Sequence, residues 1–171
     1  HLCYAVESEG GSDVDDEAGI PTSASTGSTV VAVGATLIPL LSIRPKQTFQ
    51  GKDFRGSLIP TNATVTSSRR DLYCVVLKNA TLTGPSWTSR GADSIMEYDT
   101  TATAITGGQV IAEFHVIEDS SFGLTKTTTQ SQIELVNDIL NTNSDTLTIA
   151  AQNTAGAANA LAVMGAKELR G

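Results

Sequence analysis

Residues 71–117 read DLYCVVLKNATLTGPSWTSRGADSIMEYDTTATAITGGQVIAEFHVI, and this stretch decides the fold class. It opens with a nearly continuous apolar run, Asp71–Lys78, and closes with Gln109–Ile117, in which apolar and polar residues alternate. Between them lie a Gly-Pro turn at Gly84, a run of Thr and Ala, and the Gly107-Gly108 pair. Apolar runs bounded by such turn residues are typical of short β-strands. The pattern predicts that Asp71–Lys78 is a central strand.

The rest of the chain repeats this pattern within a length of 171 residues, which suits one domain. Val30–Ile43 predicts one or two buried strands, with Pro39 as a break or bulge. Ala63–Ser67 and Ser94–Tyr98 predict further strands. Thr is the abundant polar residue, which favours strands over helices. We therefore predict an all-β fold, a jelly-roll-like β-sandwich.

Two segments near the C-terminus are less clear from their pattern. Residues 127–141 have Ser131 and Glu134 at the spacing of a helix capping box, and apolar residues at helical intervals, yet residues 132–136 also alternate like a strand. Both interpretations stay open. The last segment, DTLTIAAQNTAGAANALAVMGAKELR, alternates on both sides of Asn153–Gly156, which predicts a C-terminal hairpin around that turn.

The net charge of −7 is unevenly distributed. Residues 1–43 contain six acidic residues and no Lys or Arg, whereas the remainder is nearly neutral. Residues 7–29 hold these acidic residues and few large apolar ones, so they do not bury enough surface to order themselves. We predict an extended acidic arm over residues 1–27 and a β-sandwich domain over residues 28–171. The two cysteines, Cys3 and Cys74, are expected to be free thiols.

The search for chemistry excludes several function classes. His115 alternates with apolar neighbours and is expected to be a solvated strand residue. No nucleophile elbow, zinc-binding helix motif or phosphate-binding loop is present, and Asp13–Glu17 lacks the spacing of a calcium-binding loop. No basic face suggests nucleic acid, and the longest apolar run, Val30–Ile43, is too short to span a membrane. We therefore predict no catalytic residues, no metal, no cofactor and no enzymatic activity.

The order of three segments resembles a family of tailed-bacteriophage virion proteins. The segments are IRPKQTFQGKDFRGSLIP, then LKNATLTGPSWTSRGADSIMEYDTTATAITGGQVI, then DTLTIAAQNTAGAANALAVMGAKELR. They match the patterns RPKxTFxG, NATLTGxxW and EYDTxATAxTGG and a C-terminal DxLT…GxAN hairpin, over residues 43–170. The resemblance implies a β-rich structural domain without catalytic residues, located in the virion, in the tail, a fibre or a head decoration.

The predicted roles are structural. Gly84, Gly107 and Gly108 are expected to form tight turns, and Trp87 to anchor the core. Expected partners are other copies of the chain, in a homo-oligomer, and other virion proteins. The alternative function is a carbohydrate- or receptor-binding adhesin domain. The candidate interface residues are a basic cluster on one rim and two alanines of the C-terminal hairpin: Arg44, Lys46, Lys52, Arg55, Ala158 and Ala160.

Overall fold

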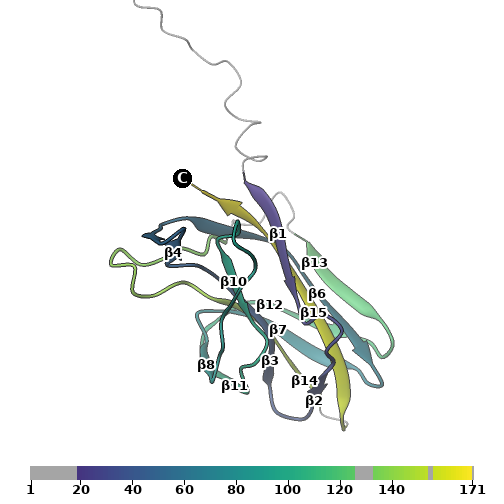
Figure 1. The fold of residues 1–171 in the computed structure, drawn as a ribbon. Coiled ribbons are helices and arrows are strands. Elements are labelled where there is room, and N and C mark those ends of the chain that lie inside the picture. Colours follow the sequence, from purple (N-terminus) through teal and green to yellow (C-terminus); the bar gives the residue numbers. More distant parts are fainter. Residues whose placement is uncertain (1–18, 126–132, 154–155, 171) are drawn as a thin grey trace, which may run out of the picture.

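The computed structural model describes residues 19–125, 133–153 and 156–170, which form fifteen β-strands and no helix. Two antiparallel sheets pack face to face, so the predicted all-β sandwich is confirmed (Figure 1). The five-stranded sheet contains β1 (Ile20–Ser25), β2 (Val31–Val33), β6 (Ser57–Ser68), β13 (Ser121–Thr125) and β15 (Ala158–Leu169). The six-stranded sheet contains β3 (Ile38–Pro45), β7 (Leu72–Lys78), β9 (Thr88–Ser89), β10 (Met96–Asp99), β12 (Gln109–Val116) and β14 (Leu147–Gln152).

Two small ribbons complete the fold. One pairs β8 (Thr81–Thr83) with β11 (Ala104–Thr106), and the other pairs β4 (Thr48–Phe49) with β5 (Lys52–Asp53). The β8–β11 ribbon covers the outer face of the six-stranded sheet, where Ile105 packs with Val75, Leu77 and Ala150 in a second apolar cluster. That sheet is therefore covered on both faces near β7.

The six-stranded sheet runs in the order β12-β7-β14-β3-β10-β9, which places β7 inside the sheet. A strand covered on both faces needs apolar residues at successive positions, which is why Leu72–Lys78 is nearly continuously apolar. The prediction of a central strand is confirmed. Pro39 also behaves as predicted, because the register of β3 against β14 shifts beside it, between Ile149 and Ala150.

The five-stranded sheet runs in the order β1-β15-β6-β13. The strands β1 and β2 both pair with β15, so they form one edge strand that is interrupted around Thr26. The predicted boundary of the arm is wrong at this point. Residues 1–18 lie outside the described part of the chain, but Ile20–Ser25 is a paired strand, so the sandwich begins at residue 20 and not at residue 28.

The C-terminal hairpin is also a wrong prediction. The strands β14 and β15 lie in different sheets, so the connection between them crosses the sandwich and does not fold back within one sheet. Ala158 and Ala160 point inward from β15 and are 0% and 1% exposed. Their small side chains belong to the core between the sheets, and they are not the interface residues that the sequence suggested.

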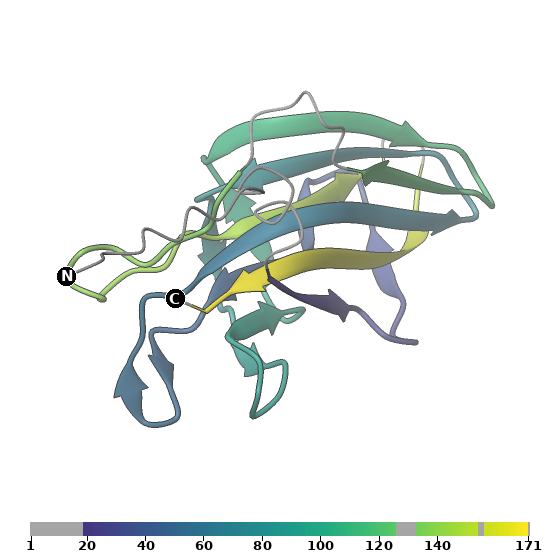
Figure 2. The same cartoon turned by 90° about the horizontal axis from the view of Figure 1, so that it is seen from above.

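The uncertain segment has no helix in its described part. Residues 133–146 form a loop with two isolated bridges, Leu58 with Leu135 and Asn137 with Ser144. We call residues 133–146 the tip loop. Figure 2 shows that the tip loop and the β4–β5 ribbon both extend from the same end of the sandwich, the end at which the C-terminus lies.

Candidate interaction surface

Side-chain amides join the two extensions into one unit. The Asn137 Nδ2 donates to the carbonyl oxygens of Lys46 and Phe54, at 2.8 and 3.0 Å. The Asn141 Nδ2 donates to the carbonyl oxygen of Gln47 at 2.7 Å. Because these backbone oxygens directly flank the ribbon, the tip loop cannot move relative to it without breaking three hydrogen bonds.

A carboxylate organises the turn at the end of the tip loop. Asp138 accepts hydrogen bonds from the Thr142 hydroxyl and backbone N–H, both at 2.6 Å, and from the Asn143 Nδ2 at 3.1 Å. The Thr142 hydroxyl is the largest of the contributions that lower the pKa of Asp138 to about 2. Asn141 adopts the left-handed backbone conformation, with φ of 55°, which Asn tolerates better than most residues. The turn is therefore held in one conformation.

This ordered turn presents two aliphatic side chains to solvent. Ile139 is 81% exposed and Leu140 is 80% exposed. The Arg55 Nη2 donates to the Ile139 carbonyl oxygen at 2.6 Å, which fixes a guanidinium beside the apolar pair. Single exposed apolar residues are common on protein surfaces. Two adjacent ones at the end of a braced turn, where Gly, Asn and Ser are usual, make this turn the candidate contact surface.

A notch of about 370 Å³ lies beside the tip loop. Its lining residues come from the tip loop and from the turn after β7: Asn79, Ala80, Val136, Asp138, Asn143, Ser144, Asp145 and Thr146. Within it, Asp145 pairs with the Lys78 ammonium at 3.1 Å and accepts from the Asn79 Nδ2 at 2.7 Å. Burial opposes the charged form, but these two partners lower the pKa of Asp145 below its usual value.

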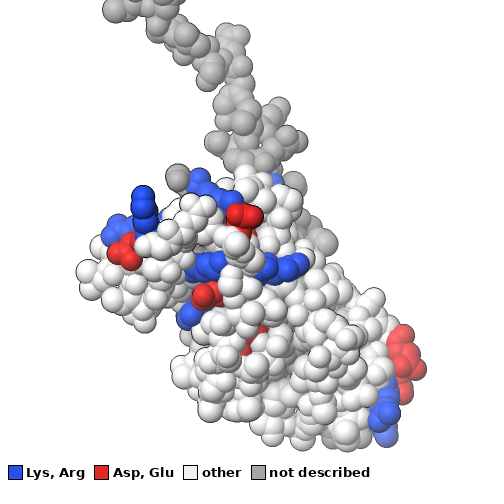
Figure 3. All heavy atoms as spheres, viewed as in Figure 1, with Lys and Arg blue, Asp and Glu red and all other residues white. Residues whose placement is uncertain are grey.

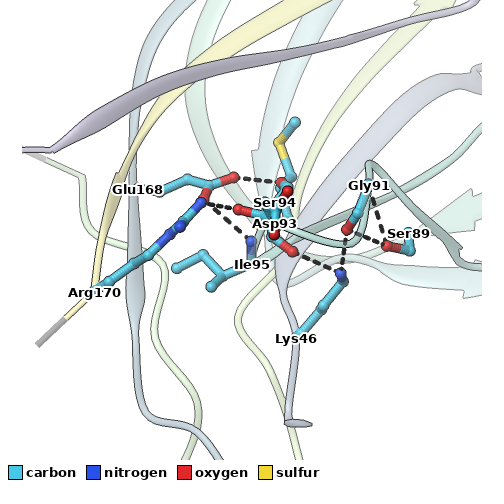
Figure 4. Close-up of polar contacts among 9 residues, drawn as sticks. Lys46, Ser89, Gly91, Asp93, Ser94, Ile95, Glu168 and Arg170 are labelled. Atoms are coloured by element: carbon cyan, nitrogen blue, oxygen red, sulfur yellow. Dashed lines mark hydrogen bonds and ion pairs between the residues drawn. The ribbon is translucent and has the colours of Figure 1, made fainter. Parts of the chain in front are cut away.

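A buried carboxylate near the end of β15 bonds to the loop before β10, at the same end of the sandwich (Figure 4). Glu168, near the end of β15, is 1% exposed and pairs with the Arg170 guanidinium at 2.8 Å. It also accepts hydrogen bonds from the Ser94 hydroxyl and from the Ile95 backbone N–H. Arg170 in turn donates to the Asp93 carbonyl oxygen. The loop before β10 is therefore fastened to the last strand by the hydrogen bonds that Glu168 and Arg170 make with it.

Two further contacts tie the ribbon to the same region. The Lys46 ammonium donates to the carbonyl oxygens of Gly91 and Ser94, at 2.9 and 2.6 Å (Figure 4). The Arg170 guanidinium lies over the Phe49 ring, 5.4 Å from its centroid. The β4–β5 ribbon is thus connected both to the loop before β10 and to the end of the chain at Arg170.

The predicted basic cluster is only partly brought together. Lys46 is bonded to the loop before β10, Lys52 is exposed on the ribbon, and Arg55 lies at the tip. Arg44 is elsewhere: it pairs with Glu97 of β10 at 2.8 Å and stacks on the Trp87 ring, 4.2 Å from its centroid. Trp87 is only partly buried and belongs to neither apolar cluster. The prediction that Trp87 anchors the core is therefore wrong.

The three predicted turn glycines do have left-handed backbones, with φ of 67°, 64° and 87° at Gly84, Gly107 and Gly108. Gly108 also approaches its neighbour closely, since a Cβ there would lie 2.8 Å from the Ala80 Cβ. The EYDT motif has a local role as well: Asp99 is 2% exposed and accepts hydrogen bonds from the backbone N–H groups of Ser86, Thr101 and Ala102. These motif residues therefore shape the loops.

Sequence reasoning missed Ile139, Leu140 and Glu168. The first two were assigned only to a helical periodicity, although the Asp-x-x-Asn spacing of Asp138 and Asn141 is a turn signal that conflicts with a helix. Glu168 gave no signal, because its partners in the loop before β10 lie more than seventy positions away in the sequence.

A second hollow, of about 320 Å³, lies between the edge strand and β10. Its lining consists of four Ser or Thr residues, two small residues, one Arg and one Tyr: Ser23, Ser25, Thr26, Thr100, Ala24, Gly27, Arg90 and Tyr98. The Arg90 Nε donates to the Ser23 carbonyl oxygen, which holds the guanidinium at the rim.

Within residues 19–125, 133–153 and 156–170, no three His, Cys, Asp or Glu side chains gather in a way that would hold a metal ion. The same part of the chain contains no helix of the length and apolarity required to cross a membrane. Comparison of the chain with protein-family models, curated proteins and solved structures gave no match.

Proposed function

We propose that the chain is a non-enzymatic structural component of a tailed-phage virion, in the tail, a fibre or a head decoration, and that it acts through contacts between subunits. The observation that carries this proposal is the braced turn with Ile139 and Leu140 about four-fifths exposed. An apolar pair held rigid in water is costly unless a partner covers it. A subunit of an assembly has such a partner in every neighbouring copy.

The strand order supports the same proposal. With β1 and β2 counted as one interrupted strand, the eight principal strands are β1/β2, β3, β6, β7, β12, β13, β14 and β15. Numbered one to eight along the chain, they lie in the orders 1-8-3-6 and 5-4-7-2 in the two sheets. We infer that the sandwich is a jelly roll, because this order results when a long antiparallel ribbon of strands wraps into two sheets. Viral capsid proteins and lectins use that architecture.

The surface composition agrees with a role in assembly. In Figure 3 the charged side chains gather in the upper half of the face and at one lower corner, and most of the lower half is uncharged. The β8–β11 ribbon presents exposed Thr81, Thr83 and Thr106 without charge. Interface centres are depleted of charged residues relative to the remaining surface, so this face is suited to contact with other protein chains.

The proposal is tested by adding purified, fluorescently labelled chain to tailed-phage particles during assembly, followed by density-gradient separation. We expect the label to sediment with intact particles, and a Leu140→Asn variant to sediment with them less. A folded chain that stays wholly at the top of the gradient would contradict a virion role.

The second candidate function is carbohydrate or receptor binding. The hollow between the edge strand and β10 favours it, because hydroxyl groups, an Arg and a Tyr are groups that bind polar ligands. Glycan-array binding by the isolated chain, lost in an Arg90→Met variant, would support this function. Array binding without recruitment to particles would favour it over the structural role.

A further inference from the structure

We propose that two copies of the chain clasp each other through their tip loops, with Ile139 and Leu140 of each copy seated in the notch beside the tip loop of the other. This inference rests on the proposed structural function and deepens it, because it names the partner of the apolar pair as a second copy of the chain.

The turn that carries Ile139 and Leu140 is already held in one conformation before any partner binds. Its backbone is braced by Asp138 from within the turn and by Asn141 bonded to the ribbon, so little conformational freedom remains to be lost on binding. Ile139 and Leu140 are the two most exposed large apolar residues among those described. A preorganised apolar knob of this kind binds at a lower entropic cost than a flexible one.

The notch is large enough for this knob, and part of its lining is apolar. Its volume of about 370 Å³ is more than twice the ~150 Å³ cavity that accommodates a benzene molecule. Two aliphatic side chains therefore fit within it. Ala80 and the half-exposed Val136 supply apolar surface, and Asn79 and Asp145 are already bonded to each other and so do not require water from the notch.

The charges also match between tip and notch. The Arg55 guanidinium lies beside the tip, because it donates a hydrogen bond to the Ile139 carbonyl oxygen. Asp138 lies on the wall of the notch and is ionised at neutral pH. When the tip of one copy enters the notch of the other, Arg55 arrives near the partner's carboxylate at this wall, a favourable pairing of opposite charges.

The shared location of knob and notch favours a second copy over an unrelated partner. Both features belong to the tip loop, so one two-fold axis brings each knob to the opposite notch and repeats every contact twice. A partner without the same loop would have to supply both a fitting cavity and a fitting apolar pair.

The test is sedimentation equilibrium of the full chain and three variants. The wild type should form a dimer. Leu140→Asn, in the knob, and Val136→Glu, in the notch wall, should each weaken dimerisation by roughly 10–100-fold, the equivalent of losing one buried aliphatic contact. Ile117→Asn is the matched control: Ile117 is 69% exposed but lies at the end of β12, outside the clasp, and its dimer should be unchanged.

A disulfide crosslink between the two copies tests whether position 140 of one copy lies next to position 136 of the other. In a Cys3→Ser background, Leu140→Cys chain mixed with Val136→Cys chain should give a disulfide-linked heterodimer, whereas neither variant alone should crosslink efficiently. A wild-type chain that stays monomeric, or equal dimerisation of the Leu140→Asn and Ile117→Asn variants, would overturn the clasp. A monomeric chain that still joins particles would overturn the clasp alone, and a clasped dimer that never joins particles would overturn the virion role alone.

Discussion

Replacing Glu168 with Gln tests whether the carboxylate of Glu168, paired with Arg170, fastens the loop before β10 to the last strand. The carboxylate is 1% exposed and accepts from Arg170, Ser94 and Ile95. Gln has nearly the same shape, and its carbonyl oxygen can take the place of Oε2 while its amide donates to the Ser94 hydroxyl, so the substitution removes chiefly the negative charge that Arg170 pairs with. Removing one partner of a buried pair costs about 3–5 kcal/mol. Because the Arg170 side chain is 27% exposed and part of its charge is solvated, we expect about 3 kcal/mol.

A double-mutant cycle isolates the pair. Arg170→Met keeps most of the side-chain volume and leaves the carboxylate with its two remaining donors, so it should cost a similar free energy of unfolding. The double variant should lose little more than either single one, which gives a coupling energy of about 2–3 kcal/mol. Urea unfolding measures these values, and a loss of about 3 kcal/mol corresponds to a fall in Tm of roughly 6–12 °C for a chain of this length. Additive losses, or single losses below about 1 kcal/mol, would refute the assignment of a structural ion pair.

Three further predictions concern the core and the turns. Ala160→Arg should unfold the chain, because it buries an unpaired charge, whereas Val163→Arg on the opposite face of β15 should leave a folded protein by circular dichroism. Gly107→Ala should cost about 1–2 kcal/mol for its left-handed backbone, and Gly108→Ala should cost clearly more in the same urea assay because its Cβ also clashes; equal costs would contradict the close approach. Burial raises the pKa of the Cys74 thiol to about 12, so in a Cys3→Ser variant it should react with a thiol reagent only after unfolding. The pKa of Cys74 in the folded chain lies above the ordinary thiol value, so burial of the protonated thiol stabilises the fold. This stabilisation is complete below about pH 9 and is lost as the pH rises toward 12. A Cys74→Ala variant should lack this part of the loss of stability at high pH.

The sequence predicted the parts of the fold that depend on local pattern. The nearly continuous apolar run of β7 correctly indicated a central strand, and Pro39 correctly indicated an irregularity in β3. The turn glycines followed from the backbone conformations that Gly alone adopts readily. These features are encoded within a few residues and need no knowledge of distant neighbours.

The failures concern contacts between distant segments. The two halves of the supposed C-terminal hairpin do alternate, but alternation does not distinguish a turn within one sheet from a crossing between two sheets, and β14 and β15 take the second route. Trp87 lies against Arg44, more than forty positions away, and not in the core. The segment that includes Ile139 was left open between helix and strand, and its described part forms neither, because Asp138 and Asn141 form a turn. In the first two cases the deciding partner was remote from the pattern, whereas the turn at Asp138 is held by local contacts.

The most direct test of the central claim is a reconstruction of intact tailed-phage particles assembled with the chain. We expect symmetric copies of a two-sheet domain on the particle, with the tip loops of adjacent copies in contact and Ile139 and Leu140 covered. Particles that contain no density for the domain, although the chain is present and folded during assembly, would contradict the claim that it is a virion component.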